Sequence, residues 1–119
     1  MPRYVALIYS AEADTPPSQE EWDTVMVEYN EFGAKAGAAG VVAGGEALHE
    51  TSTATTIHVE GGKGGEVITV DGPYAETKEA LGGFYLLDCA DLDEALEWAA
   101  LIPGAWHGYV EVRPCIDFG

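Results

Sequence analysis

Short apolar runs alternate along the chain with two longer amphipathic stretches. Runs rich in β-branched and aromatic residues predict six strands, over residues 3–9, 41–49, 53–60, 66–70, 83–89 and 107–113. The glycine-rich residues 61–65 separate the third and fourth runs and predict a hairpin with a loose tip. Gly44 and Gly45 inside the second run indicate a bulge or a close approach of another backbone.

The two amphipathic stretches predict helices, because each follows a capping residue. Ser18 with Glu21 forms a capping box, and Asp91 with Glu94 repeats the signal. The first predicted helix closes at Gly37 and Gly40, and its apolar stripe comprises Trp22, Val25, Met26, Tyr29, Phe32 and Ala36. The stripe of the second comprises Leu92, Ala95, Leu96, Ala99 and Ile102, and this helix stops at Pro103.

The predicted order is therefore β-α-β, a hairpin, and β-α-β. Two split units of this kind predict an α+β ferredoxin-like sandwich, with two helices on one face of an antiparallel sheet. At 119 residues the chain has the usual size of one domain, which we expect to cover residues 1–119.

Strand alternation shows which face of the sheet the helices would leave open. In the last strand Val110 and Val112 point one way, toward the helices, while His107, Tyr109, Glu111 and Arg113 point the other way. The strands at 4–9 and 84–89 are apolar on both faces. Two helices cover only one face, so the second would expose a large apolar patch. Either a second copy covers it, as a homodimer, or the segment 50–82 does.

Charge excludes several classes of partner. The chain has 21 acidic and 5 basic residues, a net charge of −16. Nucleic-acid binding needs a basic surface, and an anionic membrane surface would repel this chain. The apolar runs are too short to span a membrane, and the N-terminal residues do not read as a signal peptide. We therefore expect a cytoplasmic protein with Cys89 and Cys115 as reduced thiols that end separate strands.

Candidate chemistry centres on a few carboxylates. Asp71 precedes Gly72 and Pro73, where its carboxylate either accepts backbone N–H groups of the turn or acts as a general base. Glu46 follows two glycines and is either an exposed strand carboxylate or a base beside a ligand. His49, His58 and His107 lack the spacing of a zinc site, and we expect neither a metal nor an organic cofactor.

A row of polar residues on the last strand is the best polar group in the chain. One predicted face of this strand carries His107, Tyr109, Glu111 and Arg113. These side chains either supply an acid together with groups that orient a substrate, or form an ion-paired contact between two copies of the chain. Tyr74 is predicted to close over a ligand, and Lys78 either joins it or extends along the surface.

Several stretches together resemble one known family. Residues 71–79 (DGPYAETKE) and 81–86 (LGGFYL) resemble the signature of the YCII-related, or DGPF, domain family, with Tyr74 in place of the family's phenylalanine. Residues 44–48 (GGEAL), 93–98 (DEALEW) and 110–114 (VEVRP) are similar to further family stretches in the same order. The resemblance covers nearly the whole chain.

The resemblance implies a dimeric α+β barrel of ferredoxin-like protomers. Most members of the family have no assigned activity. Some occur beside or fused to sigma-factor-like regulators, and a few relatives in the wider group are small-molecule lyases that act on ring compounds. That group is associated with a His–Asp pair whose histidine lies on the first helix, but this chain has no histidine before residue 49.

Two functions follow from these observations. In the first, the protein is an enzyme that binds a small molecule in the dimer cleft and catalyses proton transfer. Asp71 or Glu46 would be the base and His107 the acid. The substrate would be oriented by Tyr74 and Arg113, and Tyr109 lies in the same row. In the second, the chain is a non-catalytic ligand-binding or regulatory module, linked to sigma-factor-type regulation. The absence of a histidine from the first helix favours the second.

Overall fold

The computed structural model describes residues 2–13 and 15–119. Its elements are β1 (Arg3–Ser10), α1 (Gln19–Ala38), β2 (Val42–Ala47), the 3-10 turn η1 (Thr51–Thr53), β3 (Thr55–Glu60), β4 (Glu66–Asp71), β5 (Ala80–Asp88), α2 (Leu92–Ala99), α3 (Pro103–His107) and β6 (Tyr109–Pro114). The six predicted strands are all present, with ends shifted by a few residues.

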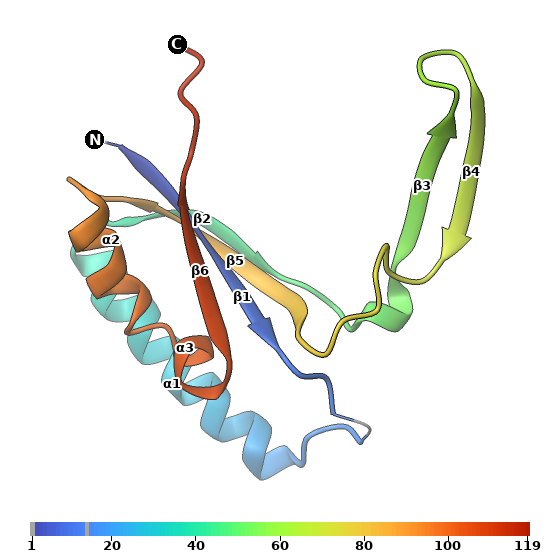
Figure 1. Cartoon of the computed structure of the whole chain (residues 1–119). Coiled ribbons are helices and arrows are strands. Elements are labelled where there is room, and N and C mark those ends of the chain that lie inside the picture. The colour runs from blue at the N-terminus through green and yellow to red at the C-terminus, as the bar shows by residue number, and fades with distance from the viewer. Residues whose placement is uncertain (1, 14) are drawn as a thin grey trace.

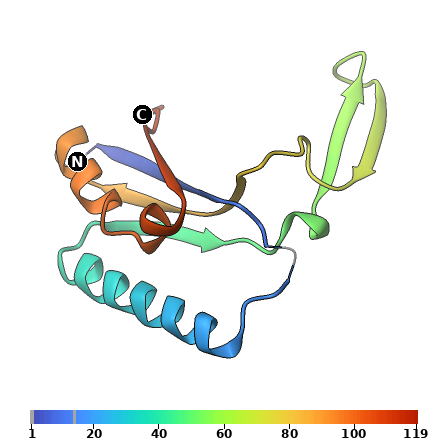
Figure 2. The same ribbon diagram turned by 60° about the horizontal axis from the view of Figure 1, so that its bottom comes forward.

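The main sheet has the strand order β2-β5-β1-β6, with antiparallel neighbours throughout. Its three helices lie on one face, and the hairpin of β3 and β4 stands apart from it (Figure 1). Figure 2 shows α1 below the sheet and the hairpin rising on the other side. This arrangement confirms the predicted ferredoxin-like α+β fold.

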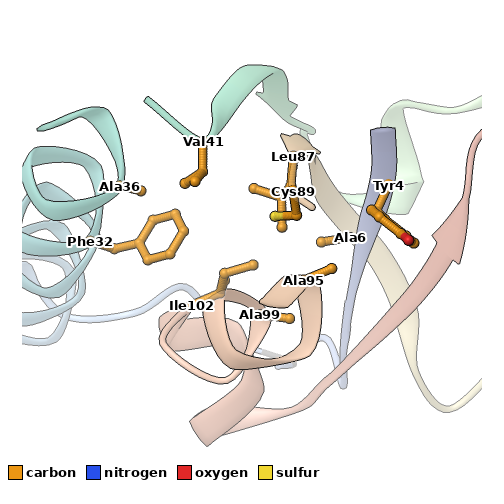
Figure 3. Packing of buried hydrophobic residues seen from close by; sticks show 10 residues of the cluster. All are labelled: Tyr4, Ala6, Phe32, Ala36, Val41, Leu87, Cys89, Ala95, Ala99 and Ile102. Carbon is orange, nitrogen blue, oxygen red and sulfur yellow. The ribbon is translucent and has the colours of Figure 1, made fainter. Parts of the chain in front are cut away.

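The core lies between the sheet and the helices (Figure 3). Tyr4 and Ala6 of β1 point into it, as the alternation predicts, and Leu87 of β5 is fully buried beside them. Ala95 and Ala99 of α2 are buried, so the helix presents small side chains and packs closely on the strands. Val110 and Val112 of β6 pack against this core from the helix side.

The structure corrects part of each predicted helix stripe. The Ser18 hydroxyl caps α1 by accepting the Glu21 N–H at 3.1 Å, as predicted. Only the C-terminal part of the stripe is buried, however, because Phe32 lies in the core while Trp22 is 52% exposed. Met26 in α1, and Leu92 and Leu96 in α2, are likewise exposed. Periodicity predicted the buried positions Phe32, Ala95 and Ala99 correctly, but the buried stripe is narrower and shorter than predicted.

A short helix replaces the start of the predicted last strand. Pro103 does end the preceding amphipathic stretch, but it also begins α3, where its missing N–H costs no hydrogen bond. Residues 103–107 are therefore helical, and β6 begins only at Tyr109. The consequence for the candidate site is that His107 lies in a helix and not on the sheet.

The hairpin does not cover the open face of the sheet, which was one of the two outcomes expected from the sequence. Its strands bond to each other from Thr55 opposite Asp71 to Glu60 opposite Glu66. Figure 1 shows the pair projecting from the far end of β5 and away from the sheet. Within the part of the chain that is described, no helix is both long and apolar enough to cross a membrane.

The two cysteines are free and differ in environment. Cys89 is fully buried at the end of β5, and burial together with the nearby Glu94 raises its pKa to about 11. Cys115 is exposed just after β6. As predicted, the strands that they end lie on either side of β1.

We expect one thiol per native chain to react quickly with a chromogenic disulfide reagent at pH 8. Only the thiolate attacks the reagent, and a pKa of about 11 leaves Cys89 almost wholly protonated at that pH. Burial also shields the Cys89 sulfur from the reagent. Adding denaturant should release the second thiol. Two fast thiols in the native protein would contradict this assignment.

Candidate functional site

The open face of the sheet is apolar along its two central strands. Val5 of β1 lies opposite Leu86 of β5, and Leu7 lies opposite Phe84. Cross-strand partners in an antiparallel pair project from the same face, so these four side chains form one patch. All four are partly exposed to solvent. We call this group, Val5, Leu7, Phe84 and Leu86, the apolar patch.

Polar residues border the apolar patch on both edge strands. Glu46 of β2 lies opposite Phe84. On β6, Glu111 lies opposite Leu7 and Arg113 opposite Val5, while Tyr109 pairs with Tyr9 beyond the patch. Three of the residues singled out from the sequence, Glu46, Tyr109 and Arg113, therefore share this face.

The two bordering carboxylates lie too far apart to work as a pair. Glu46 and Glu111 are on the outer strands, separated by three strand spacings or about 14 Å. Two carboxyl groups that act on one sugar bond, by comparison, stand roughly 5–9.5 Å apart. Glu46 and Glu111 of one chain therefore cannot both contact the same reacting bond of a ligand.

Two adjacent glycines shape the β2 border in different ways. Gly44 lies opposite Leu86 on the open face, so the surface is recessed there by one missing side chain. A Cβ at Gly44 would make only ordinary contact, 3.5 Å from Leu86 Cδ1, so the recess has room. A Cβ at Gly45 would overlap the Phe84 carbonyl oxygen. Both readings of this dipeptide hold: there is a register shift between Val42 and Gly44, and a close backbone approach at Gly45.

His107 is not part of this face, contrary to the sequence prediction. It ends α3, and its Nε2 atom lies 3.1 Å from Glu28 Oε1 of α1. Because α1 packs on the helix-covered side, the sheet separates His107 from Glu46. Strand alternation continued through Gly108 predicts His107 on the same face as Tyr109, but His107 belongs to α3 and β6 begins only at Tyr109.

Asp71 lies at the base of the hairpin, away from the apolar patch. The turn that follows it is held by other groups: the Gly72 N–H donates to the Ala54 carbonyl at 2.7 Å, and the Thr56 hydroxyl donates to the Gly72 carbonyl at 2.8 Å. Across residues 2–13 and 15–119 the Asp71 carboxylate accepts no hydrogen bond, so the first of its two expected roles, that of accepting backbone N–H groups of the turn, is wrong. Tyr74 follows nearby and is 92% exposed.

We expect Asp71→Ala to change hairpin protection by less than about 0.5 kcal/mol, because it removes no bond. Thr56→Val should cost about 1 kcal/mol, since it leaves the Gly72 carbonyl without its partner. Amide hydrogen exchange of β3 and β4 measures both: the second variant should lose protection about fivefold and the first should not. Equal losses in the two variants would restore a structural role for Asp71.

A second concave region lies beside the segment that follows Asp71. A pocket of about 490 Å³ is lined on one side by this segment, including Pro73, Glu76 and Lys78. On the other side Glu12 accepts two hydrogen bonds from Thr51, from its N–H at 2.8 Å and its hydroxyl at 2.6 Å. These bonds lower the pKa of Glu12. The Glu12–Thr51 contact joins the end of β1 to η1 and so positions this pocket.

Sequence reasoning did not find Glu12 and Thr51, because 39 residues separate them and each sits in an unremarkable polar loop. Lys78, which the sequence places either beside Tyr74 over a ligand or along the surface, lines the pocket. No group of three or more His, Cys, Asp or Glu side chains able to hold a metal ion occurs in the described portion of the chain.

Similarity to known proteins extends over nearly the whole chain. The YCII-related domain matches residues 2–119, from β1 to the end of the chain. The chain belongs to the YCII-related family. An uncharacterized protein of Rhizobium meliloti (strain 1021) is 42% identical over 114 residues, which cover 93% of this chain and 90% of that protein. In this YCII-related chain, the family signature at 71–79 forms the segment between the hairpin and β5, beside the pocket.

Proposed function

We propose that this YCII-related protein forms a homodimer through the open faces of its sheets. The apolar patch supports this arrangement, because it faces away from the helices and the hairpin leaves it uncovered. Facing sheets pack about 10 Å apart and bury such patches. A second copy of the chain is the simplest partner, because a single symmetric interface then buries the apolar patch of both copies.

The proposed role of the dimer is to bind a small, largely apolar molecule. The single observation that carries this proposal is the recess at Gly44, with Leu86 and Phe84 beside it and Glu46 at its border. A ligand site typically combines an apolar lining with a few placed polar groups, as here. The net charge of −16 repels anions, so the ligand is neutral or cationic.

Glu46 is the group that would act on this ligand. An ionised carboxylate accepts hydrogen bonds, and at a recess it would hold a hydroxyl or an ammonium group of the ligand. The same atom would serve as a general base toward a C–H or O–H proton, which would make the protein an enzyme of the lyase or isomerase type. Proton transfer of this kind typically contributes 10²- to 10⁴-fold to a rate.

A non-catalytic role is the second candidate, and one observation favours it. The acid predicted from the sequence, His107, lies on the other side of the sheet against Glu28, so it does not pair with Glu46 within one chain. A ligand-binding or regulatory module needs only the recess and the dimer. The cytoplasmic location expected from the sequence stays a prediction.

A thermal-shift screen of small neutral and cationic ring compounds tests this function. A compound present at 100 times its Kd should stabilise the native protein by about 2.7 kcal/mol. Glu46→Gln should weaken the shift and Gly44→Val should abolish it by filling the recess, whereas Glu60→Gln, an exposed glutamate on the hairpin, should leave it unchanged. If the shift survives in Gly44→Val, the recess is not the site.

The same variants separate the two candidate functions once a ligand is known. In an enzyme, Glu46→Gln at saturating ligand loses at least about 100-fold in turnover. In a binding module, no product forms with the wild-type protein.

A further inference from the structure

The β3–β4 hairpin is unusually apolar for a two-stranded arm in water. Ile57, Val59 and Val67 lie on one face of it, because Val59 pairs with Val67 and Ile57 with Thr69. Ile57 is 65% and Val67 61% exposed. The other face carries His58, Glu60 and Glu66 among its apolar residues. We call the first face, with Ile57, Val59 and Val67, the apolar arm face.

An isolated hairpin of two strands is at best marginally stable in water. Across residues 2–13 and 15–119, β3 and β4 form a two-stranded sheet of their own, to which no third strand is paired. The exposed β-branched side chains of the arm therefore lack the packing that normally stabilises such a ribbon. This arrangement favours an additional surface that covers the arm.

The position of the arm indicates what that surface is. Figures 1 and 2 show the hairpin rising from one end of the main sheet, on the side opposite α1. The arm therefore stands beside the space above the apolar patch. A sheet laid on that patch, about 10 Å away, would lie next to the arm.

The area of the main sheet points to the same partner. Four strands of about six residues give a face of roughly 20 by 19 Å, or on the order of 400 Å². A stable interface buries about 800 Å² of each partner. The sheet face alone falls short of that value, and one face of the arm adds on the order of 200 Å², which brings the total to about 600 Å² per chain, the lower end of the range for stable interfaces.

We infer that the hairpin is a dimerisation arm whose apolar face packs against a second copy of this chain. This inference rests on the proposed homodimer and specifies how it is held: the sheet faces meet, and each arm reaches along the other copy. Asp71 alternates with Val67 along β4 and so lies on the apolar arm face. The arm therefore brings the first residue of the family signature to the contact between the copies.

Two substitutions in the same strand test the inference. Val67 and Val70 are both valines of β4, 61% and 58% exposed, and they lie on opposite faces of the arm. Val67→Lys should raise the dimer Kd at least tenfold, whereas Val70→Lys should leave it unchanged. Each lysine reduces the net negative charge of the chain, so electrostatic repulsion cannot explain a weakened dimer.

Sedimentation equilibrium over a range of concentrations measures these constants, and far-ultraviolet circular dichroism checks that each variant is folded. A wild-type mass of 12.6 kDa at all concentrations would remove the proposed dimer itself. A wild-type dimer that Val67→Lys does not weaken would overturn the arm alone. Equal weakening by both substitutions would overturn the assignment of the contact to the apolar arm face.

Discussion

Leu87→Ala is expected to lower the free energy of unfolding by about 2–5 kcal/mol. Leu87 is fully buried in β5 and lies opposite Tyr4 on one side and Val42 on the other. Truncating it removes apolar contacts and leaves a cavity between the sheet and the helices, which closes only if these elements shift. Urea unfolding at a fixed chain concentration measures the loss, since unfolding of a dimer depends on concentration.

The matched control is Leu96→Ala. Leu96 is also a leucine, but it is 48% exposed on α2, and alanine favours a helix slightly more than leucine does. We expect its effect to stay within about 0.5 kcal/mol. If the two alanine variants lost similar stability, the core would not be centred where β5 crosses beneath the helices.

Gly45→Ala should destabilise the protein by about 1–3 kcal/mol. Its Cβ would overlap the carbonyl oxygen of Phe84 and lie 3.1 Å from the Cα atom of Tyr85. Both are backbone atoms inside a paired strand, so the neighbour cannot simply rotate away. The substitution should push β2 from β5 and selectively expose the β2 amides to hydrogen exchange.

Gly44→Ala, one residue earlier, is the control and should be neutral or slightly stabilising. Its Cβ meets only a side-chain methyl at an ordinary distance, and alanine loses less backbone freedom on folding than glycine does. Loss of stability at Gly44 equal to that at Gly45 would show that the close approach of β2 and β5 is not the cause.

The fold could be predicted from the sequence because its signals are local. Ser18 and Asp91 each precede an amphipathic run, and both cap their helices as expected, with Asp91 accepting the Glu94 N–H at 2.9 Å. Alternation in β1 separates Tyr4 and Ala6 from Val5 and Leu7, which assigns the two faces of the sheet correctly. The order of the elements then leaves few topologies.

The candidate site was harder to predict because it depends on where elements end. His107 moved to the other side of the sheet through a single short helix that begins at Pro103, a residue that also signals helix termination. The Glu12–Thr51 contact joins two loops distant in sequence, and no periodicity reports such a pair. Asp71 sits in the turn expected for it, yet the Gly72 N–H of that turn donates to the Ala54 carbonyl and not to the Asp71 carboxylate.

The position of β1 in the sheet also decides when this chain can fold. β1 lies between β5 and β6, and Arg3 pairs with Asp88, 85 positions later. Contacts between such distant segments cost much chain entropy and slow folding. During synthesis the first strand emerges early, but both of its edges wait for strands from the last third of the chain. Until then its apolar residues stay exposed on the ribosome, so we expect this nascent chain to rely on chaperones that shield its N-terminal strand.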